Sequence, residues 1–202
     1  MIVTASSASA LAQVVSALRE GEVVALPTDT VYGVAVSASV AGAAARLFVA
    51  KERPADVALP VLVASPRDAL ELVSDVPPAA EAMIEQWWPG PLTVVLRRGT
   101  ASRGFDLGGD GSTIGVRCPD HALVRDLARQ VGPLVATSAN RHGQPTPVTA
   151  RGVAEALSGA VRIVVDGGTC AGAPSTVVDC TAAQPRLLRE GRIPWAQIGP
   201  GH

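Results

Sequence analysis

The chain has 202 residues, of which 48% are hydrophobic and 17% charged, and its formal net charge at pH 7 is −1. This composition suits a folded domain with a substantial core and excludes wholesale disorder, and the small net charge excludes a polyanion binder held by overall charge. Because no apolar run reaches ~18 residues and the N-terminus lacks a signal-peptide pattern, we expect a cytoplasmic protein without a membrane span.

The spacing of apolar residues predicts helices that alternate with strands. We expect helices at 7–20, 39–50, 66–73, 78–87, 120–130 and 149–157. We expect strands at 22–26, 59–63, 92–96, 112–117, 134–136 and 161–165, followed by a closing pair at 175–179 and 186–188. Pro60 interrupts the second strand, which indicates an irregular start and favours a place at an edge of the sheet.

This order of elements predicts an α/β fold. The sheet is expected to be mixed, because three strand-like runs at the C-terminal end have little helix between them. The sequence shows no internal repeat or change in composition, so we expect one domain over residues 1–202, with a frayed tail at about 198–202.

Motifs of the common nucleotide-binding and hydrolytic sites are missing. The sequence contains no GxxxxGK[ST], no GxGxxG after the first strand, no HExxH and no GxSxG. The three cysteines lack zinc-ligand spacing, so we expect them to be small apolar residues, and His121 and His142 are expected at the surface. The sequence thus predicts neither a metal site nor a disulfide framework.

Four polar segments stand at the ends of predicted elements: PTDTVYG at 27–33, KERP at 51–54, STIGVRCP at 112–119 and ATSAN at 136–140. The first and fourth include or follow a buried strand's end, which is where open α/β sheets bind ligands. Several such loops together indicate one polar cleft. The first segment has a plainer alternative, a turn in which Asp29 acts as a local cap.

Three cations in these segments could each serve an anion. Lys51, the only lysine, and Arg53 could reach polyphosphate oxygens, or they could simply complement a helix dipole. Period-2 alternation places Arg117 on one face of its strand with Thr113 and Gly115. An arginine on an apolar strand needs either an acidic partner or an anion in a cleft.

Taken together and in this order, these segments resemble the YrdC-like family, whose active members are threonylcarbamoyl-AMP synthases. The matching stretches cover most of the chain: PTDTVYG at 27–33, KERP at 51–54, WPGPLT at 88–93, TIGVRCPDH at 113–121, TSAN at 137–140, STVVD at 175–179 and LLREG at 187–191. The resemblance is to the short, single-domain form. It implies a twisted mixed sheet flanked by helices around a positively charged cavity.

The resemblance also implies a reaction: L-threonine, bicarbonate or CO₂ and ATP, with Mg²⁺ carried by ATP, give threonylcarbamoyl-AMP and pyrophosphate for modification of a tRNA adenosine. Downstream partners would be tRNA or a tRNA-modifying transferase complex. Carried over by motif, the threonine site would comprise Thr30, Arg117, Ala136 and Ser175. The nucleotide site would comprise Lys51, Arg53, Thr113, Ser138, Asn140, Thr146 and Arg189, with Lys51 and Arg53 as the catalytic cations.

The sequence departs from the family pattern after KERP. Many relatives have Asn-Pro and then a histidine at the places held here by Val57, Ala58 and Leu62. This departure keeps a degenerate paralogue open as an alternative. Two further alternatives are a non-catalytic RNA-binding paralogue and a carbamoyl-adenylate site like that of hydrogenase-maturation proteins, although that site normally lies in a much longer chain with zinc-finger-like cysteines, which this sequence does not have.

Overall fold

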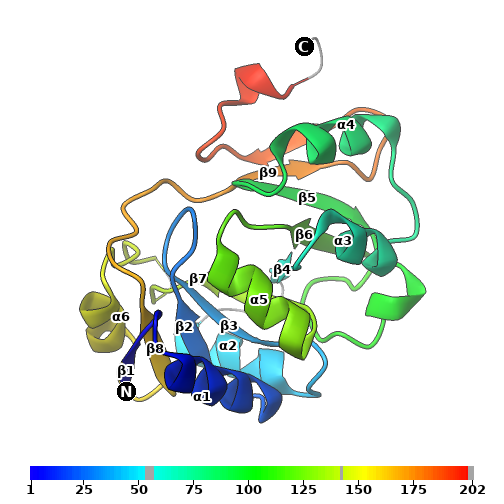
Figure 1. Ribbon diagram of the computed structural model, residues 1–202. Helices are drawn as coiled ribbons and strands as arrows, with labels where there is room; N and C mark the ends of the chain where they lie inside the picture. Colours follow the sequence, from blue (N-terminus) through cyan, green and yellow to red (C-terminus); the bar gives the residue numbers. More distant parts are fainter. Residues whose placement is uncertain (53–56, 142, 200–202) are drawn as a thin grey trace.

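The structure is a computed structural model that describes residues 1–52, 57–141 and 143–199 (Figure 1). Its α-helices are α1 Ala8–Arg19, α2 Ala43–Lys51, α3 Pro66–Leu72, α4 Pro78–Trp87, α5 Ala122–Val131 and α6 Ala150–Ala156, with 3₁₀ turns at Thr100–Ser102 and Trp195–Gln197. Its strands are β1 Ile2–Thr4, β2 Val24–Leu26, β3 Gly33–Ser37, β4 Val61–Leu62, β5 Leu92–Arg97, β6 Thr113–Arg117, β7 Leu134–Ser138, β8 Ile163–Asp166, β9 Thr176–Asp179 and β10 Arg186–Arg189.

Within the described residues, these strands form one sheet in the order β1-β8-β2-β3-β7-β4-β6-β5-β9-β10. The sheet is mixed: β8 is parallel to both its neighbours, whereas β3 is antiparallel to β2 and β7. The prediction of an α/β fold with a mixed sheet is confirmed. Strands from the first and second halves of the chain alternate in this order, so loops distant in sequence meet at the centre of the sheet.

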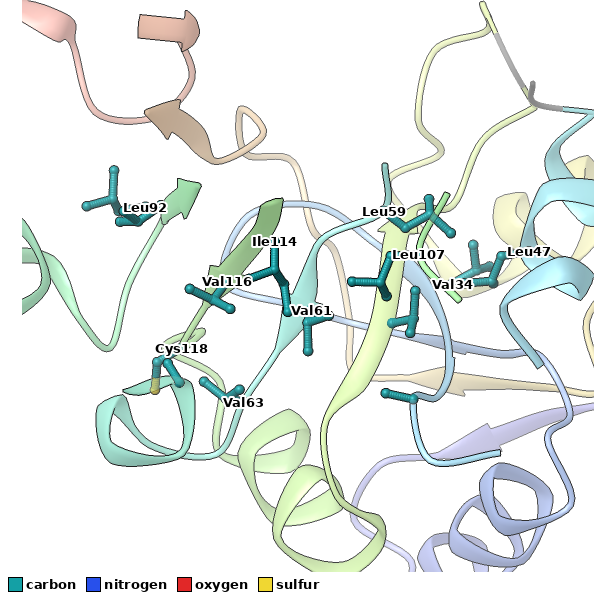
Figure 2. Close-up of a cluster of buried hydrophobic side chains, with 14 of the residues drawn as sticks. Val34, Leu47, Leu59, Val61, Val63, Leu92, Leu107, Ile114, Val116 and Cys118 are labelled. Carbon is teal, nitrogen blue, oxygen red and sulfur yellow. The ribbon is translucent and has the colours of Figure 1, made fainter. Parts of the chain in front are cut away.

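Helices cover both faces of the sheet, because its strands are apolar on both sides. Val24 and Leu26 pack with α1 and α5 in one cluster, whereas Val23 and Ala25 join a larger cluster on the opposite face. Figure 1 shows α1 and α5, which contact each other, lying across one face. Figure 2 shows part of the larger cluster, where side chains from β4 and β6 meet those from the surrounding loops.

Local capping explains where several helices begin. The side chains of Ser7, Ser65 and Thr149 accept hydrogen bonds from backbone N–H groups in the first turns of α1, α3 and α6. Pro66 then occupies the first turn of α3, where its missing N–H costs nothing.

Two strands were not predicted, β1 and β3. The sequence of β3, GVAVS, is short and begins with glycine, so its pattern gives little signal. It is a strand because β2 and β7 hydrogen-bond to it from both sides. Strand β7 also continues through Thr137 and Ser138, which the sequence assigned to a loop.

The predicted edge position of the strand at 59–63 is wrong, because β4 lies between β6 and β7. Pro60 precedes β4 and contributes only its carbonyl, which accepts a 3.0 Å hydrogen bond from Ala136 N. The predicted frayed tail at about 198–202 is wrong for its first two residues. Ile198 is buried in the larger cluster and Gly199 N donates to the Trp195 carbonyl at 2.8 Å, while residues 200–202 lie outside the described chain.

Candidate active site

A cavity of about 520 Å³ lies among the central strands and the loops that leave them. This volume is within the range of small-molecule sites. Nearly all predicted site residues in the described chain line it: Thr30, Thr113, Arg117, Ala136, Ser138, Thr146, Ser175 and Arg189. Lys51 and Asn140 lie behind this wall in contact with Ser138, and Arg53 lies outside the described residues.

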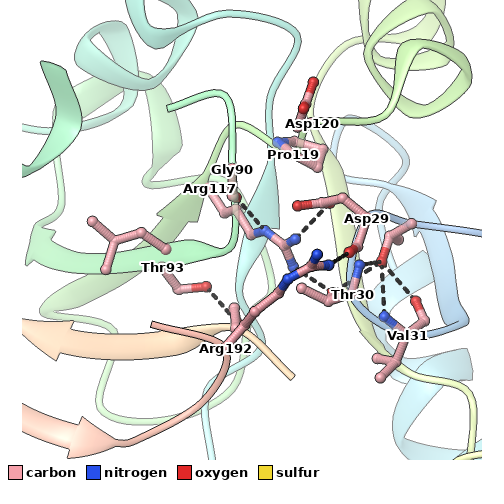
Figure 3. A network of polar contacts seen from close by, with 12 residues as sticks. Asp29, Thr30, Val31, Gly90, Thr93, Arg117, Pro119, Asp120 and Arg192 are labelled. Atoms are coloured by element: carbon pink, nitrogen blue, oxygen red, sulfur yellow. Dashed lines mark hydrogen bonds and ion pairs between the residues drawn. The ribbon is translucent and has the colours of Figure 1, made fainter. Parts of the chain in front are cut away.

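Arg117 is the buried cation of this cavity, with 6% of its surface exposed. Its Nε donates to the Gly90 carbonyl at 3.0 Å, its Nη1 to Thr30 Oγ1 at 3.1 Å and its Nη2 to Asp29 Oδ1 at 2.6 Å (Figure 3). Each terminal nitrogen carries two N–H groups. Among the described contacts, one donor on each therefore remains for a ligand.

The sequence predicts that Arg117 needs either an acidic partner or a bound anion. The acidic partner is Asp29. Burial lowers the pKa of Arg117 from its usual value, and the adjacent Asp29 carboxylate opposes that shift. The second carboxylate oxygen, Asp29 Oδ2, is buried without a hydrogen-bond partner in the described structure. Asp29 is therefore more than a turn cap, because it compensates a buried charge at the cavity.

Ser175 joins the two halves of the predicted site. Its Oγ lies 2.9 Å from Thr93 Oγ1, and its carbonyl accepts from Arg189 Nη2 at 2.8 Å. Arg189 Nη2 also lies 3.2 Å from Ser175 Oγ. The resemblance placed Ser175 with threonine and Arg189 with the nucleotide, so the two predicted sites adjoin at this contact.

Lys51 lies behind the cavity wall at the predicted nucleotide site. It ends α2 with only 3% of its surface exposed, and its Nζ donates to the Ser138 carbonyl at 2.5 Å and to Asn140 Oδ1 at 3.1 Å. Asn140 Oδ1 also accepts from Ser138 Oγ at 2.5 Å and from Thr146 Oγ1 at 3.3 Å. The lysine thus fixes the hydroxyl groups that line the cavity.

Val57 and Leu62, which stand where many relatives have an asparagine and a histidine, both line this cavity. Val57 is 50% exposed at its wall, and Leu62 is buried at 7% exposure beside it. Leu62 is paired with Arg117 in the register of β4 and β6. An apolar residue therefore occupies the position next to Arg117 on the neighbouring strand.

Sequence reasoning missed two groups that contact the site. Thr93 appeared only within a matching stretch, and its contact with Ser175 depends on the pairing of β5 with β9. Arg192 donates from Nη1 to the Asp29 carbonyl, and no sequence pattern indicated this. His121, expected at the surface, is half-buried; burial lowers its pKa, and its Nδ1 has no partner among the described residues.

Within residues 1–52, 57–141 and 143–199, no cluster of three or more His, Cys, Asp or Glu side chains is placed to hold a metal ion. In the same ranges, no helix is long and apolar enough to cross a membrane.

The fold and the cavity define the class: an α/β protein whose mixed sheet carries a pocket lined by hydroxyl groups and the buried Arg117, with the buried Lys51 behind its wall. Residues 16–191 match the family model described as "Telomere recombination", which covers Sua5, YciO and YrdC proteins. The chain belongs to this family.

Relatives in this family include the threonylcarbamoyl-AMP synthase of Pyrococcus abyssi, 40% identical over 90% of this chain and 54% of its own length. A putative threonylcarbamoyl-AMP synthase of Mycobacterium leprae is 39% identical over 95% of this chain and 87% of its own. The chain thus spans about half the length of the first relative and most of the second.

Solved structures agree with the fold. The structure of P. abyssi Sua5 complexed with L-threonine has a TM-score of 0.91 and 36% identity, over 98% of this chain and 59% of its own. The structure of Escherichia coli YciO has a TM-score of 0.84 at 24% identity, over 96% and 95%, and supports the fold alone. A twisted mixed sheet flanked by helices is thereby confirmed.

Proposed function

We propose that this protein forms threonylcarbamoyl-AMP and pyrophosphate from L-threonine, bicarbonate and ATP. The observation that carries the proposal is that one cavity brings the Arg117 guanidinium together with the hydroxyl cluster fixed by Lys51. A site for an amino acid and a nucleotide needs two kinds of anion recognition, and these two groups supply them.

The threonine site would consist of Thr30, Arg117, Ser175 and the backbone of Ala136. The remaining N–H groups of Arg117 suit a carboxylate, while Thr30 and Ser175 offer hydroxyl partners. The relative whose structure contains L-threonine supports this assignment, because it shares the fold over nearly the whole chain.

The nucleotide site would lie toward Thr113, Ser138, Asn140, Thr146 and Arg189. Lys51 and Arg53 would neutralise the phosphates, with Lys51 acting through the Ser138 and Asn140 network as well as by its charge. Mg²⁺ is proposed to arrive bound to ATP, where it bridges phosphate oxygens.

The reaction joins three substrates in two steps. The threonine amine adds to bicarbonate or CO₂ to give a carbamate, with loss of water when bicarbonate is used. A carbamate oxygen then attacks the α-phosphorus of ATP, and the bond to the pyrophosphate oxygen breaks. Because both partners are anionic, catalysis requires charge neutralisation and alignment more than an acid–base group.

The product is a reactive mixed anhydride, so we propose that a tRNA-modifying transferase consumes it, in the cytoplasm where ATP and tRNA are present. The alternative of a non-catalytic RNA-binding paralogue has less support. RNA binding by a basic surface has no use for a cavity with a buried arginine and paired hydroxyl groups.

The proposal is tested by incubating the protein with ATP, Mg²⁺, bicarbonate and L-threonine and measuring pyrophosphate release. Threonine should stimulate release, whereas L-serine in its place should stimulate it less, and a threonylcarbamoyl adduct of AMP should be detectable by mass spectrometry. Release that does not depend on threonine would remove this proposal and favour the alternatives.

A further inference from the structure

The segment after β10 runs back to the loop that carries Asp29, beside the cavity, and hydrogen-bonds to it. Arg192 N donates to the Pro174 carbonyl at 2.9 Å, and its Nη1 donates to the Asp29 carbonyl. The next residue is fixed as well, because Ile193 N and Ile193 O both hydrogen-bond with Thr176 Oγ1. The position of Arg192 is therefore set by backbone contacts on either side.

Arg192 adds a second positive charge beside the pair formed by Asp29 and Arg117. Figure 3 shows its side chain reaching from the C-terminal segment to Asp29, near the guanidinium of Arg117. Burial is the main cause of the lowered pKa of Arg117, and repulsion between the two arginines lowers it further. His121 also lies near this group, but its lowered pKa favours the neutral form at pH 7.

The charge balance of this group decides what it can bind. Asp29 neutralises Arg117 through a 2.6 Å ion pair, so the pair alone offers little net attraction to a further carboxylate. With Arg192 included, two cations stand against one carboxylate, and one positive charge remains to balance a bound anion.

We propose that Arg192 is a positioning residue of the amino-acid site, which supplies the net positive charge that lets Arg117 receive a ligand carboxylate while paired with Asp29. The inference rests on the proposed function, since it assumes that the ligand is an amino acid. Arg192 is exposed, so solvent screens its charge and the effect should be moderate.

The test is the affinity of the full chain for L-threonine, measured by calorimetry in the wild type, Arg192→Gln and Arg192→Lys. We expect Arg192→Gln to weaken threonine binding about tenfold, and Arg192→Lys to weaken it only about two- to threefold, because lysine keeps the charge. Affinity for ATP should change by less than about twofold in both variants.

Arg186→Gln is the matched control. Arg186 lies on β10, is 74% exposed and pairs with Asp179 rather than with a cavity residue. Its variant should bind threonine like the wild type. The melting temperatures of all variants should agree within about 2 °C, as expected for exposed substitutions.

A second ligand separates charge from structure. L-Threoninamide lacks the carboxylate, so Arg192→Gln should not weaken its binding. Unchanged threonine affinity in Arg192→Gln would overturn the inference, as would an equal loss for threonine, threoninamide and ATP, which indicates mere distortion of the site. A wild type that binds no threonine would instead overturn the proposed function, and this inference with it.

Discussion

The sequence left two explanations for Arg117, an acidic partner or an anion in a cleft, and the structure is compatible with both. It pairs with an acid, Asp29, and it also faces a cavity with two N–H donors not used by the described contacts. The two roles are compatible because a guanidinium presents donors along several directions. A lysine at this place would offer three donors on a single nitrogen atom and could not present two pairs of donors in a plane.

Replacement of Arg117 by alanine should weaken binding of threonine more than binding of ATP. It should also lower the free energy of unfolding by about 3–5 kcal/mol, because the buried Asp29 carboxylate loses its partner. Calorimetric titration of each ligand and urea denaturation measure the two effects.

Arg125→Ala is the control for this variant. The Arg125 side chain is 21% exposed; it pairs at 3.1 Å with the more exposed Asp120 and donates to the Pro119 carbonyl at 2.8 Å, so its loss should cost about 1–2 kcal/mol. Equal losses of affinity for threonine and ATP in Arg117→Ala would show that its role is assigned wrongly.

Lys51→Met should reduce the rate of pyrophosphate release about 10²- to 10³-fold, the usual cost of losing one charge-stabilising donor in an active site. Methionine has a similar length and fits the buried position, so the change removes mainly the charge. Initial rates at saturating substrates measure the effect.

The matching control is Arg46→Met on the same helix, since Arg46 pairs with Glu22 at the surface. It should leave the rate unchanged. If the two variants lose activity to the same extent, Lys51 serves the stability of α2 rather than the reaction.

At the level of elements, the β9–β10 hairpin and its flanks bring Ser175 and Arg189 to the cavity wall and Arg192 to the loop that carries Asp29. Its turn back toward the site depends on Gly191, because a Cβ there would lie 2.2 Å from the Pro174 carbonyl oxygen and 2.5 Å from the Ser175 carbonyl carbon. These are backbone atoms, so the overlap could be relieved only by moving the hairpin.

Gly191→Ala should therefore displace this segment, lower the free energy of unfolding by about 1–3 kcal/mol and reduce activity. Hydrogen exchange of residues 186–193 should accelerate. Gly104→Ala is the control, because no atom lies within 4 Å of its added Cβ. Unchanged exchange in Gly191→Ala would mean that the hairpin does not need this close approach.

At the level of the whole molecule, the larger core cluster on one face of the sheet buries titratable groups that link stability to pH. Burial raises the pKa of the Cys118 and Cys180 thiols from 9.0 to about 11. The folded state therefore holds these protons to higher pH than the unfolded chain does, which stabilises it below pH 9.0. This contribution is lost as the pH rises toward about 11.

The free energy of unfolding should accordingly fall between about pH 9 and 11, as measured by urea denaturation. In the double variant Cys118→Ala and Cys180→Ala the decline should be shallower. A parallel decline in both proteins would assign the pH dependence to other groups, such as Tyr32, whose pKa is also raised by burial.

Most helices and the mixed sheet were predictable, because apolar periodicity and caps such as Ser7 and Ser65 are local signals. The role of β3 was not, because its pairing with β2 and β7 is decided by distant residues. The central place of β4 depended likewise on its neighbours. The positive charge of the cavity as a whole and the single-domain organisation stay predictions.

For the site, the sequence alone determined which residue types stand at the strand ends, and the order of its motifs determined the family. Only the tertiary structure decided which residues contact each other: Asp29 with Arg117, Lys51 with Ser138, and Arg192 with the loop at Asp29. The physical reason is that these pairs lie 87 to 163 residues apart in sequence. A charged residue in an apolar strand indicates that it needs a partner, but the order of the strands in the sheet determines which residue that partner is.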